Sequence, residues 1–230
     1  MSTTERTAPP ATRTVDPSEP PSPRWRGRLH QAAFFVSLPA SLALVAAAGS
    51  VEARVASAVY ALGLIGLFGT SAAYHRFPWS TRGKRIMKRL DHSMIFVLIA
   101  GTYTPIALLV VQGAWSIALL AVVWGGAALG IALKFLRIDG FHVVSGALYI
   151  VLGWLAIAAF PAMVRGLHPV ALAFIVAGGL LYTTGAIVLA LRRPDPNPQV
   201  FGYHEVWHTF TIAAGACHYV ATLLVVVMVP

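Results

Sequence analysis

The chain has 230 residues, of which 57% are hydrophobic and only 11% are charged, and its formal net charge is +9. Soluble domains ordinarily carry about 25% charged residues, so this composition excludes an ordinary soluble globular protein and indicates a membrane protein. The single cysteine, Cys217, excludes a disulfide framework and a cysteine-based zinc site within one chain.

The first segment, residues 1–24, is rich in Pro, Ser and Thr and contains almost no large apolar residues. Such a segment cannot bury enough apolar surface to offset the entropy that is lost when the chain becomes ordered. We therefore predict a disordered cytoplasmic tail, followed by a membrane domain that covers residues 25–230.

Seven apolar stretches follow this tail, and each approaches or exceeds the ~20 residues that cross a hydrocarbon core about 30 Å thick. Pro and Gly within them are tolerated in lipid, where small residues also let helices approach closely. The sequence thus predicts an all-α integral membrane protein, a bundle of seven transmembrane helices. The predicted spans are residues 30–48, 54–75, 91–111, 114–134, 142–162, 169–191 and 205–229.

Lysine and arginine are distributed unequally between the two sides of this predicted bundle. Fifteen of the 17 lie in the tail or in the segments after the second, fourth and sixth spans, and only Arg54 and Arg165 fall on the other side. Because cytoplasmic segments are enriched in these residues, we expect a cytoplasmic amino terminus and an outside carboxyl terminus. The high net charge then reflects orientation in a cell membrane, with membrane lipids rather than nucleic acid as the expected partners.

The predicted topology brings three histidines and one aspartate to the same depth, near the cytoplasmic face. His75 ends the second span, Asp91 begins the third, and His204 and His208 begin the seventh. His204 and His208 are four residues apart, so they lie about 6 Å from each other on one face of a helix. With His75 as a third nitrogen ligand, they would form a set suited to catalytic Zn²⁺ with an open position. Alternatively, they are ordinary histidines that face headgroups or core partners.

Two further side chains are candidates for a catalytic role. Ser71 lies one helical turn before His75 on the same face, where its hydroxyl is placed to hold a water molecule or a substrate oxygen. A serine in a membrane helix also commonly bonds back to the carbonyl four residues earlier. Asp91 is a costly intramembrane carboxylate and therefore a functional candidate. It could act as a general base, orient a ligand histidine, or form an ion pair with the basic turn that precedes it.

Other polar residues of the spans are weaker candidates. His30 and His142 also lie near the cytoplasmic face, where they could be alternative ligands or could support the ligand histidines, although interfacial anchoring is expected for each. His218 lies ~15 Å deeper than His208 at the helical rise, too far to share one metal ion. Glu205 remains an unassigned carboxylate at the interface or beside the site.

Three segments of the chain resemble the motifs of a known family. They are "SAAYH" at Ser71–His75, "LDHSMIFVLIAGTYTP" at Leu90–Pro105 and "HEVWHTFTIAAGACHY" at His204–Tyr219. In this order they resemble the hemolysin III branch of the progestin and adiponectin receptor (PAQR) superfamily, over residues 28–229. The resemblance implies a seven-helix bundle in a bacterial plasma membrane with the amino terminus inside.

The same resemblance implies roles for individual residues. The zinc histidines of the family match His75, His204 and His208, and its motif serine and aspartate match Ser71 and Asp91. The superfamily is related to the alkaline ceramidases, which implies a zinc-dependent hydrolase of lipid amides.

We therefore expect a zinc-dependent hydrolase of lipid amide or ester bonds that takes part in membrane lipid homeostasis. In this hypothesis Asp91 is the general base, and Ser71 donates to an oxyanion or positions water. One alternative is a non-enzymatic membrane sensor or regulator with a structural zinc. Another is a cytolysin or pore-former, as the family name suggests, although no predicted span carries a sustained polar stripe. The sequence does not define the oligomeric state.

Overall fold

The structure is a computed structural model that describes residues 23–136 and 142–228, so most of the predicted tail, residues 1–22, lies outside the described residues. The described residues form α-helices and no strands. In chain order the helices are α1 (Arg28–Ala47), α2 (Val51–Arg76), α3 (Thr81–Leu109), α4 (Ala114–Leu136), α5 (His142–Trp154), α6 (Ala156–Gly166), α7 (Pro169–Leu191) and α8 (Tyr203–Met228).

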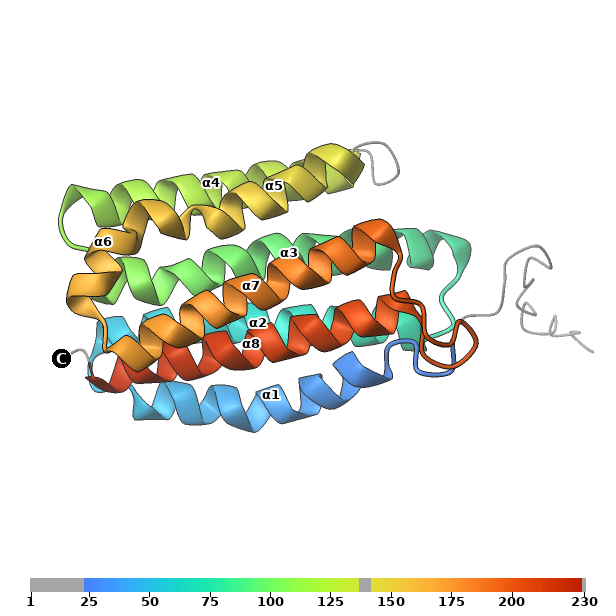
Figure 1. Ribbon diagram of the computed structural model, residues 1–230, viewed down its shortest axis with the longest axis horizontal. Helices are drawn as coiled ribbons and strands as arrows, with labels where there is room; N and C mark the ends of the chain where they lie inside the picture. The colour runs from blue at the N-terminus through green and yellow to red at the C-terminus, as the bar shows by residue number, and fades with distance from the viewer. Residues whose placement is uncertain (1–22, 137–141, 229–230) are drawn as a thin grey trace, which may run out of the picture.

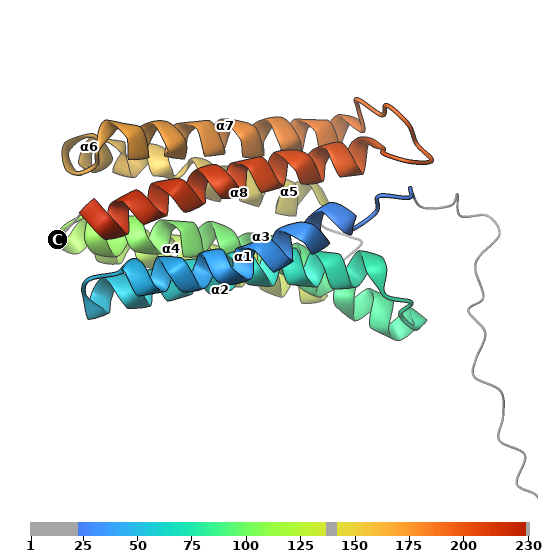
Figure 2. The ribbon, with the colours of Figure 1, turned by 90° about the horizontal axis from the view of Figure 1, so that it is seen from below.

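The helices lie side by side along the long axis of the molecule (Figures 1 and 2). Seven segments are long and apolar enough to cross a membrane, and α5 and α6 together supply the fifth. The prediction of an all-α bundle with seven transmembrane helices is confirmed. We call the end where α2 ends and α8 begins the histidine end. The last described residue of α8, Met228, lies at the opposite end (Figure 1).

The third helix begins ten residues earlier than the predicted span. The Ser80 hydroxyl caps α3 by accepting a hydrogen bond from the Gly83 N–H at 3.2 Å, and the helix starts at Thr81. Its first ten residues are mostly polar or basic. Hydropathy therefore marks only where α3 becomes apolar, and the helix itself extends beyond that point toward the histidine end.

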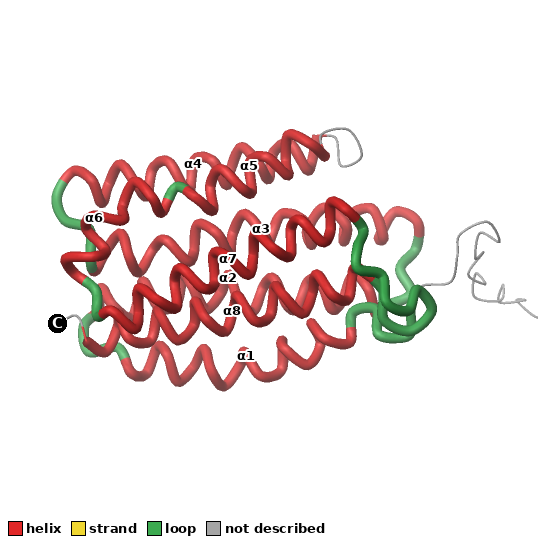
Figure 3. Tube along the Cα trace, in the orientation of Figure 1, coloured by secondary structure: helices red, strands yellow, loops and turns green. Residues whose placement is uncertain are grey.

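The fifth span is interrupted at Leu155, between α5 and α6, a break that the sequence analysis did not predict (Figure 3). The buried Tyr103 hydroxyl from α3 fills the break: it accepts a hydrogen bond from the Ala156 N–H at 2.6 Å and lies 2.9 Å from the Leu152 carbonyl and 2.8 Å from the Gly153 carbonyl. Lipid offers no hydrogen bonds to free backbone groups, so such a break is stable only where protein groups replace them.

Close packing of α2 against α3 depends on two glycines. A β-carbon at Gly63 of α2 would lie 3.2 Å from the Leu98 Cα of α3, and one at Gly101 of α3 would lie 3.3 Å from the Val59 carbonyl oxygen of α2. Without side chains at these two positions, the helix backbones approach each other directly, as small residues allow in membranes. This contact fixes α3, and with it Asp91, relative to the end of α2.

Candidate metal centre

The last turn of α2 and the first two turns of α8 meet at the histidine end and bring three histidines together. The start of α8 is fixed by two capping bonds. The Glu205 carboxylate accepts from the Gly202 N–H at 2.9 Å, and the Asp195 carboxylate accepts from the Tyr203 N–H at 2.9 Å. These bonds set where the helix begins, and therefore which face of it presents His204 and His208.

His75, His204 and His208 each offer one nitrogen, and the three nitrogens lie within 4.8 Å of one another. The His75 and His204 Nε2 atoms are 3.3 Å apart. Two nitrogens bound to one Zn²⁺ at ~2.0–2.1 Å in tetrahedral geometry would lie about 3.3 Å apart, so this pair already has the spacing of a zinc site. The third ring, His208, is 1% exposed, and its Nε2 has no hydrogen-bond partner among the described residues. The donor set therefore fits a zinc ion.

The three-histidine set contains no carboxylate from the described residues. Asp91 is buried on α3, beside the Ser71 hydroxyl of α2. Its Oδ2 also lies 3.6 Å from His92 Nδ1, which in turn is 2.8 Å from the Lys88 carbonyl oxygen. Ser71 is four residues before His75, so this Ser–Asp pair lies one turn deeper in the bundle than the histidine at the end of α2.

A fourth histidine, His30 of α1, packs directly against the cluster. Its ring stacks on that of His208 with centroids 3.7 Å apart and planes at 9°, and it is 2% exposed. His30 is therefore buried inside the bundle. The interpretation of His30 as an interfacial anchor was wrong. Its position in the first span predicted the depth of His30, but not that its ring faces His208.

An amino-terminal strap, residues 23–27, covers the cluster and was not anticipated from the sequence. Its backbone is hydrogen-bonded to the loop before α8, from the Trp25 N–H to the Val200 carbonyl at 3.1 Å. Arg26 Nε lies 2.7 Å from Oε1 of Glu205, which is fully buried. Gly27 has a φ of +76°, and a β-carbon there would lie 2.6 Å from the His75 Cβ. Glu205, unassigned from the sequence, thus caps α8 and pairs with the strap.

The other histidines whose side chains the structure describes do not join the three-nitrogen set. His218 lies further along α8 against Gly178 of α7, as its predicted depth required. His168 is the N-cap of α7 at the opposite end. His142 begins α5, but its side chain is outside the described residues. Cys217 is a free thiol on α8.

Comparison with known proteins agrees with the fold and the motif pattern. The family model described as "Haemolysin-III related" matches residues 20–219. The chain belongs to the hemolysin III family. It is 32% identical to Hemolysin-3 from Bacillus cereus over 200 residues, which cover 86% of this chain and 88% of the relative. It is 30% identical to the Hemolysin-3 homolog from Bacillus subtilis (strain 168), over 87% of this chain and 92% of the relative.

The hemolysin III chain also has more distant relatives in animals. It is 26% identical to the Monocyte to macrophage differentiation factor from Homo sapiens, over 73% of this chain and 69% of the relative. Family membership is consistent with the PAQR resemblance of the three motifs. With seven membrane-spanning helices and bacterial hemolysin-3 relatives, this member of the family is a multi-pass protein of the bacterial plasma membrane.

Proposed function

We propose that this hemolysin III protein is a zinc-dependent hydrolase of lipid amide or ester bonds that acts in membrane lipid homeostasis. The observation that carries the proposal is the convergence of His75, His204 and His208, whose ligand nitrogens lie within 4.8 Å of one another at the end of membrane-spanning helices. A site in this position meets lipid carbonyls where headgroups join acyl chains. Bound by three histidines with a fourth position open, Zn²⁺ supplies Lewis-acid polarisation of a carbonyl and activation of water.

The Ser71–Asp91 pair would handle the proton in this reaction. The Asp91 carboxylate is outside the three-nitrogen set, which is consistent with a free fourth position and supports hydrolysis over a closed structural site. As general base, an Asp91 Oδ atom would accept the proton of the attacking water and return it to the leaving amine or alcohol. The Ser71 hydroxyl, which lies beside that carboxylate, would hold it in position.

The buried surroundings of the cluster would keep the reaction away from bulk water. His30 stacks on His208, and the Arg26–Glu205 ion pair covers the cluster from the amino-terminal side. We further propose that the histidine end faces the cytoplasm. The two basic residues assigned to the other side, Arg54 and Arg165, lie at the start of α2 and the end of α6, which is the distribution that the positive-inside rule requires.

A second candidate function is a non-enzymatic sensor or regulator in which zinc is structural. It is favoured by the fact that the three histidines come from two helices, α2 and α8, so that a bound ion would fasten the last transmembrane helix to the second. In that function the loss of zinc would lower the stability of the bundle, and the protein would have no catalytic activity with or without zinc.

Hydrolysis is tested by incubating zinc-loaded protein with a panel of lipid amides and esters in mixed micelles and measuring released fatty acid. We expect Asp91→Asn to reduce release about 10²–10⁴-fold, the usual contribution of a general base. The matched control is Glu52→Gln, which neutralises a carboxylate in the first turn of α2 at the opposite end. Equal release by wild type and Asp91→Asn would remove Asp91 from the mechanism. No release from any lipid by zinc-loaded wild type would favour the regulator.

A further inference from the structure

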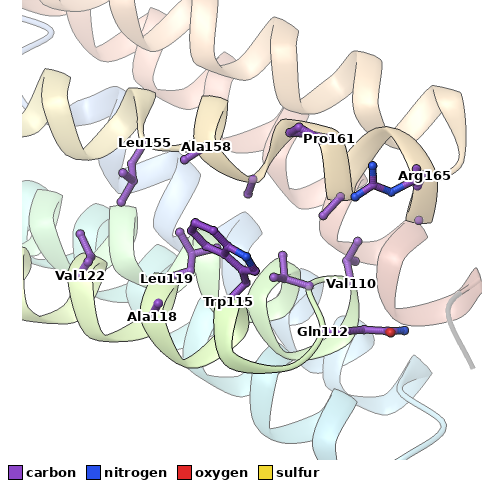
Figure 4. A pocket seen from close by; sticks show the side chains of 14 residues that line it. Val110, Gln112, Trp115, Ala118, Leu119, Val122, Leu155, Ala158, Pro161 and Arg165 are labelled. Atoms are coloured by element: carbon purple, nitrogen blue, oxygen red, sulfur yellow. The ribbon is translucent and has the colours of Figure 1, made fainter.

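A second feature of the molecule lies at the opposite end of the bundle, away from the histidines. A groove of about 620 Å³ opens between α4 and α6, beside the connection from α3 to α4 (Figure 4). This volume is within the ~300–1,000 Å³ range of small-molecule sites in proteins. The groove shares no residue with the metal centre, so its function is a separate question.

Small side chains on the two facing helices create the groove. Ala118 lines it from α4, and Ala158 and Ala162 line it from α6. Trp115 stands between the two helices with its indole in the groove (Figure 4). Trp115 is 73% exposed and Val122, which is ~10 Å further along α4, is 53% exposed, so the groove is open toward the surrounding lipid.

The lining changes from polar to apolar with depth. Gln112 and Arg165 stand at the mouth, in the connection after α3 and in the last turn of α6. The rest of the lining is apolar, down to Leu155, which is ten residues or ~15 Å of helix from Arg165. A phospholipid in a leaflet has the same order, with a charged headgroup at the surface and acyl chains below it.

The positive charge at the mouth of the groove comes from Arg165. No carboxylate among the described residues forms an ion pair with Arg165, and the acidic residue described at this end, Glu52, belongs to the distant start of α2. A cation at the membrane surface attracts anionic lipid headgroups, and a guanidinium binds phosphate oxygens by paired hydrogen bonds.

We propose that this groove is a binding site for an anionic phospholipid of the leaflet at the opposite end from the histidines. The lipid phosphate is held by Arg165 and Gln112, and one acyl chain lies along the groove past Trp115 between α4 and α6. The proposal does not depend on the hydrolase function, because the groove shares no residue with the metal centre.

The proposal is tested with full-length protein in vesicles that contain phosphatidylglycerol and phosphatidylcholine. In one preparation the phosphatidylglycerol carries bromine atoms on its acyl chains, and in the other preparation the phosphatidylcholine does. Bromine quenches tryptophan fluorescence at contact, and subtraction of the Trp115→Phe variant isolates the Trp115 signal from the other five tryptophans. We expect phosphatidylglycerol to be favoured over phosphatidylcholine roughly fivefold at Trp115, the preference that one basic residue gives at a membrane surface.

Four variants separate this site from general surface attraction. Arg165→Gln should abolish the preference and Arg165→Lys should keep most of it. Arg54→Gln removes the other positive charge assigned to this side, outside the groove, and should leave the preference unchanged. Ala158→Phe should fill the groove and reduce Trp115 quenching by both brominated lipids.

Three results would overturn the proposal. Equal losses in Arg165→Gln and Arg54→Gln would indicate surface attraction alone, and unchanged quenching in Ala158→Phe would show that no chain enters the groove. A wild-type dimer that Ala158→Phe converts to a monomer would make a second copy of the chain the occupant. Native mass spectrometry of the same variants in detergent distinguishes a retained lipid from a second copy.

Discussion

The Nε2 atoms of His75 and His204 lie 3.3 Å apart although the two residues are 129 positions apart in the sequence. This contact joins the end of α2 to the start of α8. Two unprotonated imidazole nitrogens repel each other at such a distance unless a proton or a cation lies between them. A zinc ion would satisfy both nitrogens at once, and His208 Nε2, which has no hydrogen-bond partner among the described residues, would supply the third ligand.

From this contact we predict one zinc ion per chain that depends on each of the three histidines. His75→Ala, His204→Ala and His208→Ala should each lower bound zinc from about one equivalent to well below one, because two nitrogens leave an incomplete site. His168→Ala, at the N-cap of α7, is the control and should keep the metal. Zinc is measured by elemental analysis after metal-supplemented purification. A substoichiometric wild type, or a His208→Ala variant that keeps its zinc, would show that the site is wrong.

The stacked ring of His30 is predicted to position His208 and not to bind the metal itself. His30→Phe keeps a flat ring against His208 and should retain zinc affinity within a few-fold. His30→Ala removes the stack, which is worth about 0.5–1.5 kcal/mol for aromatic pairs, and should weaken zinc binding by roughly 2–12-fold. Competition with a zinc chelator measures both variants. If His30→Phe loses zinc as completely as His208→Ala does, His30 is a fourth ligand.

These features show how far the sequence alone could define the site. The convergence of His75, His204 and His208 followed from topology, because alternating spans return to the same face and i, i+4 spacing places two side chains on one side of a helix. The stacking of His30 required knowledge of the angle at which α1 faces α8, which depth alone does not give. The ordered strap was not predicted for another reason, because Arg26 lies beside a Pro-rich segment whose composition predicts disorder.

The limits of hydropathy explain the remaining differences in the fold. The polar first turns of α3 fall below any apolar threshold although Ser80 caps a real helix there. The break at Leu155 is invisible in an apolar stretch because the group that stabilises it, the Tyr103 hydroxyl, comes from a helix about fifty residues away. Both differences arise from polar contacts that a composition-based prediction does not represent.

The ion pair between Arg26 and Glu205 is predicted to hold the strap on the cluster. Arg26→Gln leaves a fully buried carboxylate whose one remaining partner among the described residues is the Gly202 N–H, and should lower the free energy of unfolding by up to about 3 kcal/mol. The double variant Arg26→Gln/Glu205→Gln should be more stable than Arg26→Gln, because the uncompensated charge is gone. Arg28→Gln changes an exposed arginine two residues away and is the control.

Thermal unfolding in detergent measures all of these charge variants, and chelator competition reports on the metal in the same samples. Because Glu205 lies between His204 and His208 on α8, we expect zinc affinity to fall together with stability in Arg26→Gln. A double variant that is no more stable than Arg26→Gln would mean that the buried carboxylate is not charged, and that the strap is held by its backbone hydrogen bonds alone.

Packing between α3 and α4 offers a prediction with an internal control on one helix. A β-carbon at Gly130 would lie 2.3–2.5 Å from ring atoms of Phe96, a side chain that is fully buried in the core. Gly130→Ala therefore has to displace a rigid ring, and should destabilise the bundle by about 1–3 kcal/mol.

Gly125, on the same helix, is the control, because a β-carbon there would have nothing within 4 Å. Gly125→Ala should leave the unfolding midpoint unchanged or slightly raised, since alanine is the better helix former by about 1 kcal/mol. Equal midpoints for the two variants would mean that α4 can move away from α3 at little cost, and that the close contact at Gly130 contributes little to the stability of the fold.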